Sequence, residues 1–272
     1  TGCTVVRAIN PSTLAKGRKS AAEAAFVREA MAEDGAAMCE FYAWFEAAMA
    51  RGERITELTV DERLSAERAQ RKGFVALPDS FAVIAGKGAK DTDGLLLIDS
   101  GGQYLGGTTD ITRVWPIGTV TPAMKRDYTL VLKGTMNLSR ARFPRGTASP
   151  MLDTLARAPL WEHGIDFGHG TGHGVGYFLN VHEGPQSISK AVPEPHMAME
   201  PGMITSDEPG VYRPGQWGVR IENLLLNVPA STAENGAFGE MLAFETLTLC
   251  PIDARCLDTA LMRPDEIAWL ND

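Results

Sequence analysis

Two stretches of this chain, far apart in the sequence, follow the same pattern: an apolar strand ends in a carboxylate, the chain turns, and a second carboxylate follows. The two strands cover residues 95–98 and 203–206. The acidic residues of the pattern are Asp99, Asp110, Glu208 and Glu222. The spacing within each stretch suits a hairpin with a broad loop. If a pseudo-twofold axis relates the hairpins, all four carboxylates point at one place, so we expect two related halves around a shared site.

Carboxylates gathered in a partly buried site cannot all remain ionised, because like charges disfavour one another. Two divalent cations would supply four positive charges and remove this repulsion. A neutral imidazole is the usual nitrogen ligand, and His173 is the best candidate because its Gly-rich surroundings, residues 170–176, leave room for close approach. Carboxylate oxygens with one nitrogen favour Mn²⁺ or a similar ion over a thiolate zinc site. Two such ions about 3.5–4 Å apart share one water and lower its pKa.

The overall charge is consistent with an acidic cleft and argues against nucleic acid as a partner. The 272 residues contain 26 Lys and Arg against 34 Asp and Glu, a net charge of −8, whereas a nucleic-acid footprint needs clustered Lys and Arg. No apolar run approaches the roughly 18–20 residues of a membrane span, and the first residues have no signal-peptide pattern. Four cysteines without a CxxC pair are typical of free thiols in a reducing compartment. We therefore predict a cytoplasmic protein without a nucleic-acid or membrane partner.

Helical and strand patterns follow one another without a linker rich in Ser or Gly, which predicts one domain. Helices are predicted for residues 17–51, 122–142 and 149–163, from a capping box at residues 59–62, and after Pro264. Strands are predicted for residues 81–84, 95–100, 111–115, 203–207, 218–227 and 243–249. The first helix carries an apolar stripe that we assign to the core, with Phe26, Phe41, Trp44 and Phe45 among its members.

Six short segments in a fixed order carry the most specific signal. They are residues 97–104 (LIDSGGQY), 107–113 (GTTDITR), 169–176 (HGTGHGVG), 178–185 (FLNVHEGP), 207–210 (DEPG) and 220–223 (RIEN). Together they resemble the aminopeptidase P family of Xaa-Pro aminopeptidases, and the ending at residues 244–249 (FETLTL) resembles its long cytosolic members. The resemblance runs from about Asn10 to Leu270. It rests on the order of the motifs rather than on any one of them.

The resemblance implies an α+β pita-bread fold. In this fold two pseudo-twofold-related halves surround a curved, mostly antiparallel sheet with helices outside. It also implies that residues 1–272 form a single catalytic domain and that the creatinase-like N-terminal domains of long relatives are absent.

Carried over motif by motif, the resemblance assigns five metal ligands, which are Asp99, Asp110, His173, Glu208 and Glu222. Asp110 and Glu222 would bridge two divalent cations, Mn²⁺ in the first place, with Zn²⁺ or Co²⁺ as alternatives. Glu208 would also accept a proton from the bridging water. Taken singly, Asp99, Asp110 and Glu208 would also fit ordinary turn or loop positions.

Further residues would face the substrate in this resemblance. His182 would sit beside the substrate amide and move a proton or hold the carbonyl on the proline side, although it also fits a core histidine. His169 would line the substrate pocket. Arg220 would orient ligands or substrate, and Tyr212 is a weaker candidate near the metals. Two histidines match no motif and are assigned to the surface, His163 and His196.

The chain departs from the family pattern before Leu95. Relatives carry a longer stretch there, with a His-Tyr pair whose histidine faces the substrate. Here only residues 82–94 lie between Phe81 and Leu95, and none of them is His, Tyr or Trp. Metal binding should survive, because all five ligand positions are intact. The loss of a group that handles a proton or orients the substrate typically costs about 10²–10⁴-fold in rate.

These arguments predict a dinuclear metal-dependent aminopeptidase that hydrolyses the N-terminal Xaa-Pro bond of a peptide by way of a metal-bridging hydroxide. Two alternatives stay open: a catalytically impaired or silent pita-bread module that binds peptides or proteins, and a prolidase that acts on Xaa-Pro dipeptides. The predicted partners are peptides with proline at the second position. A homodimer is one of the oligomeric states that the sequence leaves open.

Overall fold

The computed structural model describes residues 2, 8–77, 82–85, 94–234 and 236–271. Its α-helices are α1 (Pro11–Gly17), α2 (Ala21–Ala50), α3 (Glu57–Ala69), α4 (Pro122–Ser139), α5 (Asp153–Trp161) and α6 (Pro264–Asn271). Its 3₁₀ helices are η1 (Ser149–Leu152), η2 (Pro195–Met197), η3 (Ala254–Cys256) and η4 (Thr259–Leu261). Its strands are β1 (Phe74–Ala76), β2 (Ala82–Ala85), β3 (Gly94–Ser100), β4 (Gln103–Tyr104), β5 (Gly107–Thr108), β6 (Ile111–Ile117), β7 (Arg142–Pro144), β8 (Gly172–His173), β9 (Ser187–Ile188), β10 (Ile204–Asp207), β11 (Gly210–Arg213), β12 (Trp217–Arg220), β13 (Asn223–Ala230) and β14 (Met241–Thr246).

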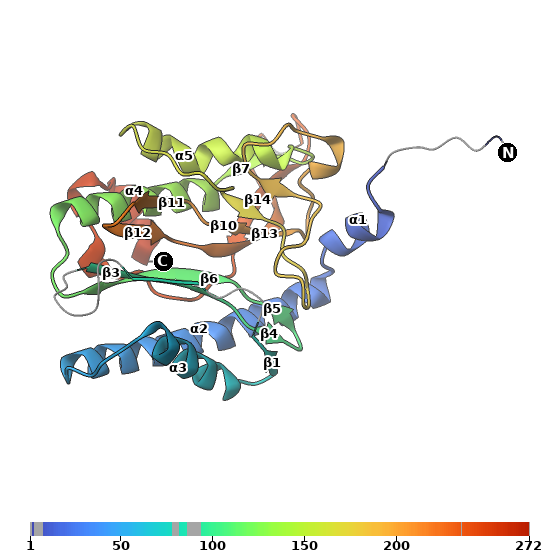
Figure 1. Cartoon of the computed structure of the whole chain (residues 1–272). Coiled ribbons are helices and arrows are strands. Elements are labelled where there is room, and N and C mark those ends of the chain that lie inside the picture. Colours follow the sequence, from blue (N-terminus) through green and yellow to red (C-terminus); the bar gives the residue numbers. More distant parts are fainter. Residues whose placement is uncertain (1, 3–7, 78–81, 86–93, 235, 272) are drawn as a thin grey trace.

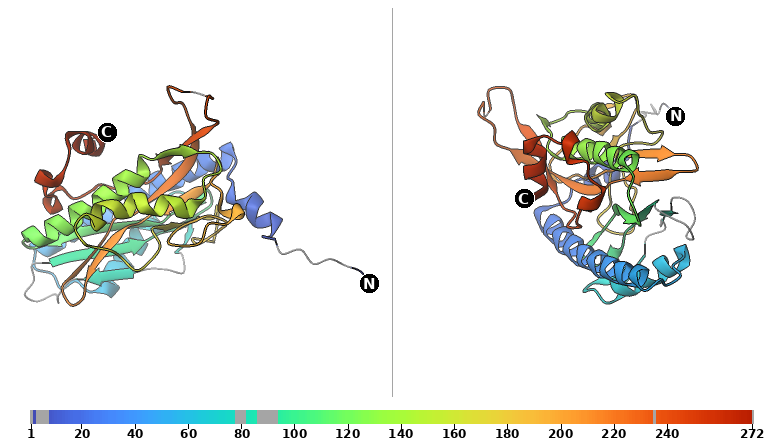
Figure 2. Two further views of the ribbon diagram at one scale, coloured as in Figure 1. Left: turned by 90° about the horizontal axis from the view of Figure 1, so that it is seen from above. Right: turned by 90° about the vertical axis from the view of Figure 1, so that its left-hand side faces the viewer.

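Strands form the middle layer of the molecule, and helices cover both sides of it. α4 and α5 lie on one side, and α2 and α3 lie on the other (Figure 1). The end-on view shows α2 along one face of the strands and α4 along the opposite face (Figure 2). The main ladders, β2-β3-β6 and β10-β13-β14-β7, are antiparallel. This combination of helices and antiparallel strands confirms the predicted α+β class.

Strand β3 shows why both faces need a cover. Leu96 and Ile98 join the apolar cluster that contains α2. Leu95 and Leu97 join the cluster that contains α4. Successive side chains of a strand point to opposite faces, so an unbroken apolar run indicates a strand that is buried on both sides.

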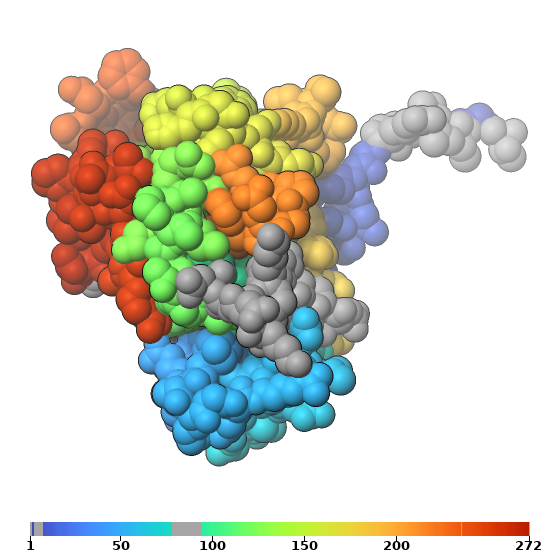
Figure 3. Space-filling view, turned by 60° about the vertical axis from the view of Figure 1, so that its left-hand side comes forward, coloured from blue at the N-terminus to red at the C-terminus, as the bar shows by residue number. Residues whose placement is uncertain are grey.

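Both predicted hairpins are present, and the second differs in one respect. β3 pairs with β6, with Asp99 opposite Thr112. In the second half, β10 pairs with β13 and β11 pairs with β12. The prediction of one strand over residues 218–227 is therefore wrong, because the chain leaves both ladders at Glu222. The backbone N–H of Glu222 donates instead to the carbonyl of Thr112 in the first hairpin, at 3.1 Å. In the space-filling view the β11–β12 hairpin (orange) reaches the surface beside α5 (Figure 3).

The first helices differ from prediction at two points. α2 confirms the first predicted helix, and Phe41 and Phe45 are buried on it. Phe26 is 50 % exposed, so its assignment to the core is wrong. α3 begins earlier than predicted, because the side chain of Thr56 caps it and accepts a hydrogen bond from the backbone N–H of Thr59.

Helices α4, α5 and α6 confirm the three remaining predicted helices, although the first two are shorter than predicted. The ends assigned to them form β7 and η1 instead. In the segment before Leu95, β2 covers the first four residues, while Phe81 and residues 86–93 lie outside the described residues. No described helix is both long and apolar enough to span a membrane.

Candidate metal centre

The acidic residues of the two hairpins meet at one place. Asp110, His173 and Glu222 each offer a ligand atom within 4.8 Å of the other two. The Nε2 atom of His173 lies 3.6 Å from Asp110 Oδ2 and 3.5 Å from Glu208 Oε1. Arg220 contacts both Asp99 and Glu208, with its Nη2 2.5 Å from Asp99 Oδ2 and its Nε 3.8 Å from Glu208 Oε2. The structure thus brings all five predicted ligands into one cluster.

Strand ends position these side chains. Asp99 lies in β3, Asp110 precedes β6, His173 ends β8, Glu208 follows β10, and Glu222 lies between β12 and β13. The backbones approach too closely for any residue except glycine at two points. A Cβ at Gly172 would lie 1.8 Å from the carbonyl oxygen of Ser206, and one at Gly101 would lie 1.9 Å from that of Thr109.

The ring of His173 is oriented as in metal sites. Its Nδ1 lies 3.0 Å from the carbonyl oxygen of Gly174 and donates to it, which leaves the lone pair of Nε2 facing the carboxylates. Its separations of 3.5 Å and 3.6 Å from the carboxylate oxygens exceed an ordinary hydrogen bond. They suit donor atoms that share one cation at about 2.0–2.2 Å each. The donor set therefore fits a divalent cation.

The electrostatics of the cluster lead to the same conclusion. Burial, together with the neighbouring carboxylate of Asp110, raises the pKa of Asp99. Burial is also the main cause that raises the pKa of Glu208 to about 7 and the pKa of Glu222 well above its usual range. Burial opposes the charged form of His173, but the carboxylates of Asp110 and Glu208 outweigh it and raise the pKa of this imidazole. Bound cations would replace the protons that these groups otherwise hold.

A directed chain of hydrogen bonds joins the cluster to His169. Arg220 donates through Nη2 to Asp99 Oδ2 at 2.5 Å and through Nη1 to the Tyr212 hydroxyl at 2.7 Å. The ring of His169 donates through Nδ1 to the carbonyl of Gly170 at 2.7 Å, so its Nε2 accepts from the Tyr212 hydroxyl at 2.8 Å. Burial lowers the pKa of His169, which agrees with a neutral ring. The Tyr212 hydroxyl therefore links Arg220 to His169 by hydrogen bonds.

A cavity of about 530 Å³ opens over the cluster. Its lining contains His169, Gly170, Gly172, His173, His182, Ser187, Ser189, Glu208 and Arg220. The ring of His182 stands edge-on to that of His173, with 4.2 Å between the centroids, and burial lowers the pKa of His182. Of the residues predicted to face the substrate, His169, His182 and Arg220 therefore line one cavity, whereas Tyr212 is hydrogen-bonded to His169 and Arg220 without lining it. His163 is exposed, as predicted, whereas His196 is half-buried and lies 3.4 Å from Glu194.

Two hydroxyl groups beside the ligands were missed by the sequence analysis. Thr112 donates to Glu222 Oε2 at 2.7 Å, and Ser206 donates to Glu208 Oε1 at 3.1 Å. Ser206 also accepts the backbone N–H of His173 at 2.9 Å. A signal for Thr112 was available, because it follows Asp110 by two residues and thus points to the same face of the strand.

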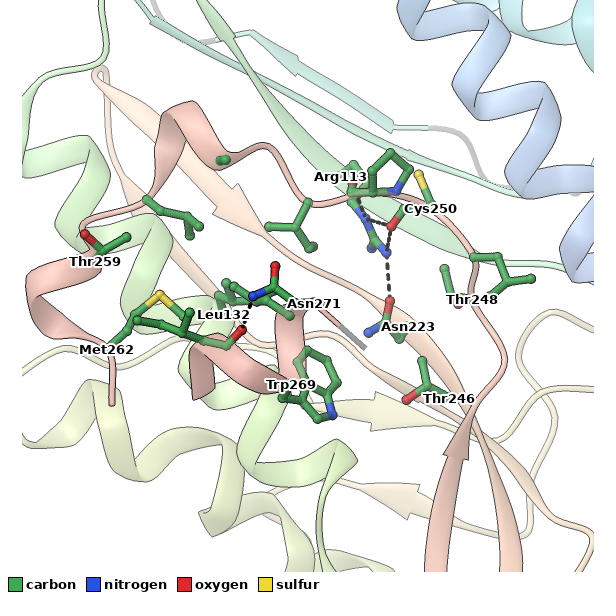
Figure 4. A pocket seen from close by; sticks show the side chains of 17 residues that line it. Arg113, Leu132, Asn223, Thr246, Thr248, Cys250, Thr259, Met262, Trp269 and Asn271 are labelled. Carbon is green, nitrogen blue, oxygen red and sulfur yellow. Dashed lines mark hydrogen bonds between the residues drawn. The ribbon is translucent and has the colours of Figure 1, made fainter. Parts of the chain in front are cut away.

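A second cavity of about 530 Å³ lies beside the C-terminal segment and does not include the ligands (Figure 4). Trp269 and Met262 contribute to its mostly apolar lining. The guanidinium of Arg113 in this cavity bonds the carbonyl of Cys250 at 2.8 Å and that of Glu222 at 2.6 Å. Arg113 thus links the C-terminal segment to the backbone of a predicted ligand.

Comparison with known proteins agrees with this site. Residues 25–227 match the metallopeptidase family M24, and residues 240–272 match the C-terminal region of that family. A probable Xaa-Pro aminopeptidase P of Tuber melanosporum is 40 % identical over 254 residues, which cover 88 % of this chain and 41 % of the relative. Aminopeptidase P1 of Lotus japonicus is 37 % identical over 305 residues, covering 98 % of this chain and 46 % of the relative. The chain thus spans less than half the length of these relatives.

Solved structures give the same answer for the fold. An X-prolyl aminopeptidase of Caenorhabditis elegans, described as a cytosolic enzyme with a di-nuclear active site, superimposes with a TM-score of 0.90 at 35 % identity. The match covers 96 % of this chain and 44 % of the nematode enzyme. A Xaa-Pro dipeptidase of Bacillus anthracis gives a TM-score of 0.70 at 26 % identity over 89 % of this chain and 64 % of that enzyme. The fold is the pita-bread fold, and the chain belongs to the metallopeptidase family M24.

Proposed function

We propose that residues 1–272 form the catalytic domain of a dinuclear metal-dependent aminopeptidase that hydrolyses the N-terminal Xaa-Pro bond of peptides. The observation that supports this most directly is the cluster of Asp110, His173 and Glu222 beneath a cavity lined by further histidines. Proteins to which this chain is similar include a probable Xaa-Pro aminopeptidase P and an X-prolyl aminopeptidase.

Asp99, Asp110, His173, Glu208 and Glu222 would hold the two ions. We propose Asp110 and Glu222 as the bridging ligands, as the resemblance implies, and ligand atoms of both lie within 4.8 Å of each other and of a His173 ring nitrogen. When bound, two divalent cations lower the pKa of a shared water and polarise the scissile carbonyl. Mn²⁺ is the ion that we propose for this donor set, since carboxylate oxygens dominate it.

The protein's own residues handle the proton and hold the peptide. Glu208, whose pKa burial raises to about 7, is suited to accept a proton near neutral pH and pass it on. His182 stands at the wall of the cavity beside His173, where its ring can bond the peptide or move a proton. Arg220 and His169 also line the cavity, and the Tyr212 hydroxyl joins them by hydrogen bonds. A pocket that accepts the proline amide needs no acceptor for an N–H, because proline has none.

Metal analysis of the dialysed protein is the first test. We expect two equivalents of tightly held Mn²⁺, Co²⁺ or Zn²⁺, and fewer than one equivalent would count against an enzyme. Peptides then define the reaction. We expect cleavage of Xaa-Pro-Xaa tripeptides, whereas exclusive cleavage of Xaa-Pro dipeptides would establish a prolidase instead, the activity named for the Bacillus anthracis neighbour.

One observation favours the second candidate, a catalytically impaired or silent module that binds peptides. The alignment with the plant relative extends over 305 positions, more than the 272 residues of this chain, so the relative contains residues within the aligned range that this chain lacks. Residues 82–94 contain no histidine. Tight metal binding combined with peptide binding but no cleavage would support this candidate. We propose a cytoplasmic location for either form, and no oligomeric state.

A further inference from the structure

A buried ion pair on α5 is hydrogen-bonded to the backbone of His169, a residue that lines the cavity. Arg157 is 1 % exposed, and its Nε donates to Oδ2 of Asp153, one turn earlier on the helix, at 2.6 Å. A buried ion pair is often no more stabilising than an apolar pair of the same shape, because desolvation cancels much of the attraction. The planar guanidinium does, however, provide fixed geometry. Its other contacts therefore show what it holds in place.

The remaining donors of Arg157 bind the segment that leads into the cavity. Nη1 donates to Asp166 Oδ1 at 2.7 Å and to the carbonyl of Phe167 at 2.8 Å. Nη2 donates to the carbonyl of His169 at 2.7 Å. The guanidinium carbon also lies 3.7 Å from the centroid of the Phe167 ring. These contacts fix the backbone of residues 166–169 against α5.

Asp153 extends the same connection to a metal ligand. Its second oxygen, Oδ1, accepts the hydroxyl of Thr171 at 2.7 Å. The carbonyl of Thr171 accepts the backbone N–H of Glu208, also at 2.7 Å. The ion pair therefore holds two successive parts of one segment, first at His169 and then at Thr171.

We propose that Arg157, held by Asp153, is a positioning residue that sets the ring of His169. With the backbone of His169 fixed, the Tyr212 hydroxyl donates to the Nε2 of its ring at 2.8 Å. The same hydroxyl accepts a hydrogen bond from Nη1 of Arg220. A small displacement of His169 would break this chain of hydrogen bonds. The effect of Arg157 on catalysis rests on the proposed function, because His169 lines the proposed peptide site.

NMR of the full chain carrying ¹⁵N-labelled histidine tests this proposal, because it reports the ring tautomer of His169. The chain has five histidines, and His169→Gln assigns the relevant signal. We expect a neutral ring with its proton on Nδ1 and a hydrogen-bonded Nε2. Arg157→Lys keeps the charge but cannot reproduce the planar set of donors. It should shift His169 toward the Nε2-protonated form while the signals of His163 and His196 stay unchanged.

Two variants frame this result. Tyr212→Phe removes the donor to Nε2 and should shift the same signal. Arg145→Lys alters a surface arginine that also binds two carboxylates, those of Glu200 and Glu240, and should leave His169 unchanged. A folded Arg157→Lys protein with the wild-type signal of His169 would overturn the proposal.

A milder variant covers the case in which Arg157→Lys does not fold. Asp166 is 43 % exposed, and Asp166→Ala removes one acceptor from the same guanidinium. It should give a smaller shift in the same direction, and no shift would contradict the proposal. The NMR result is independent of whether the chain cleaves peptides. If cleavage is established, Arg157→Lys should lower kcat/KM about 10–100-fold, mainly through KM, with the metal content unchanged.

Discussion

The hydroxyl of Thr112 donates a hydrogen bond of 2.7 Å to Oε2 of Glu222, and this bond joins the first hairpin to the second. Thr112 lies in β6, whereas Glu222 lies at the break between β12 and β13. Both side chains are buried. A fixed donor on one oxygen of a buried carboxylate restricts its orientation and favours its ionised form, which is the form that binds a cation.

Removing this hydroxyl should weaken metal binding while leaving the fold intact. Thr112→Val is nearly isosteric, and we expect its affinity for Mn²⁺ to fall about 10–100-fold, as for other residues that orient metal ligands. Isothermal titration of the metal-free protein measures this directly. Thr112→Ser keeps the donor and should bind like the wild type. Equal affinities for the Val and Ser variants would show that the hydroxyl does not orient Glu222.

The two proposed bridging ligands should be indispensable for the dinuclear site. We expect Asp110→Asn and Glu222→Gln to reduce the bound metal from two equivalents to one or fewer and to abolish any peptidase activity, because each loses a charge at the centre of the cluster. Elemental analysis after dialysis gives the stoichiometry. Glu240→Gln, at a side chain that is 71 % exposed, is the matched control and should keep both ions. Retained activity in either ligand variant would disprove the bridging assignment.

Metal binding should stabilise the protein more at pH 8 than at pH 5.5. Burial raises the pKa of Glu208 from 4.5 to about 7 in the metal-free protein. Since the raised value belongs to the folded state, the contribution of this group is present below about pH 4.5 and is lost as the pH rises through about 7. Cations compete with protons for this site, so the stabilisation that metal binding provides should grow as the pH rises over the same interval.

Thermal unfolding with and without Mn²⁺ at the two pH values checks this expectation. One site at a hundredfold excess of ligand over Kd contributes about 2.7 kcal/mol. For a chain of this size that corresponds to a rise in Tm of roughly 5–10 °C. We expect a rise of this order at pH 8 and a clearly smaller one at pH 5.5. A pH-independent rise would show that protons and metal do not compete for the site.

The ion pair between Asp34 and Arg68 should matter for stability rather than for metal binding. Both side chains are fully buried, and Arg68 Nε donates to Asp34 Oδ1 at 2.6 Å while the hydroxyl of Tyr104 donates to the same oxygen at 2.8 Å. Asp34→Ala leaves a buried guanidinium without its partner, and we expect the free energy of unfolding to fall by about 3–5 kcal/mol. Denaturant titration measures the loss.

The exposed ion pair of Arg51 and Glu53 provides the control for that experiment. Glu53→Gln should change the free energy of unfolding by no more than about 0.5 kcal/mol, because solvent screens the pair. Asp34→Ala should keep its two metal ions wherever it remains folded. A loss of metal in the folded variant would indicate that the Asp34–Arg68 ion pair also helps to position the metal ligands.

Several features followed from short stretches of sequence because their causes are local. The unbroken apolar run of Leu95–Ile98 predicted a strand, and β3 forms there with both of its faces buried. The carboxylates at the strand ends predicted one acidic cluster. By contrast, the capping box assigned to Thr59 was wrong, because the backbone N–H of Thr59 bonds Thr56. Two plausible caps three residues apart cannot be distinguished without the packing of the helix.

What the sequence by itself determined was the strands β3, β6, β10 and β14 and the residues that converge, since apolar runs and the position of carboxylates are properties of neighbouring residues. Only the tertiary structure decided how the site is held. The chain breaks at Glu222 because its backbone bonds the distant Thr112. Arg157 contacts His169 across a turn that no periodicity describes. Contacts of this kind join segments that no local sequence pattern relates, and their geometry exists only once both segments are packed against the same core.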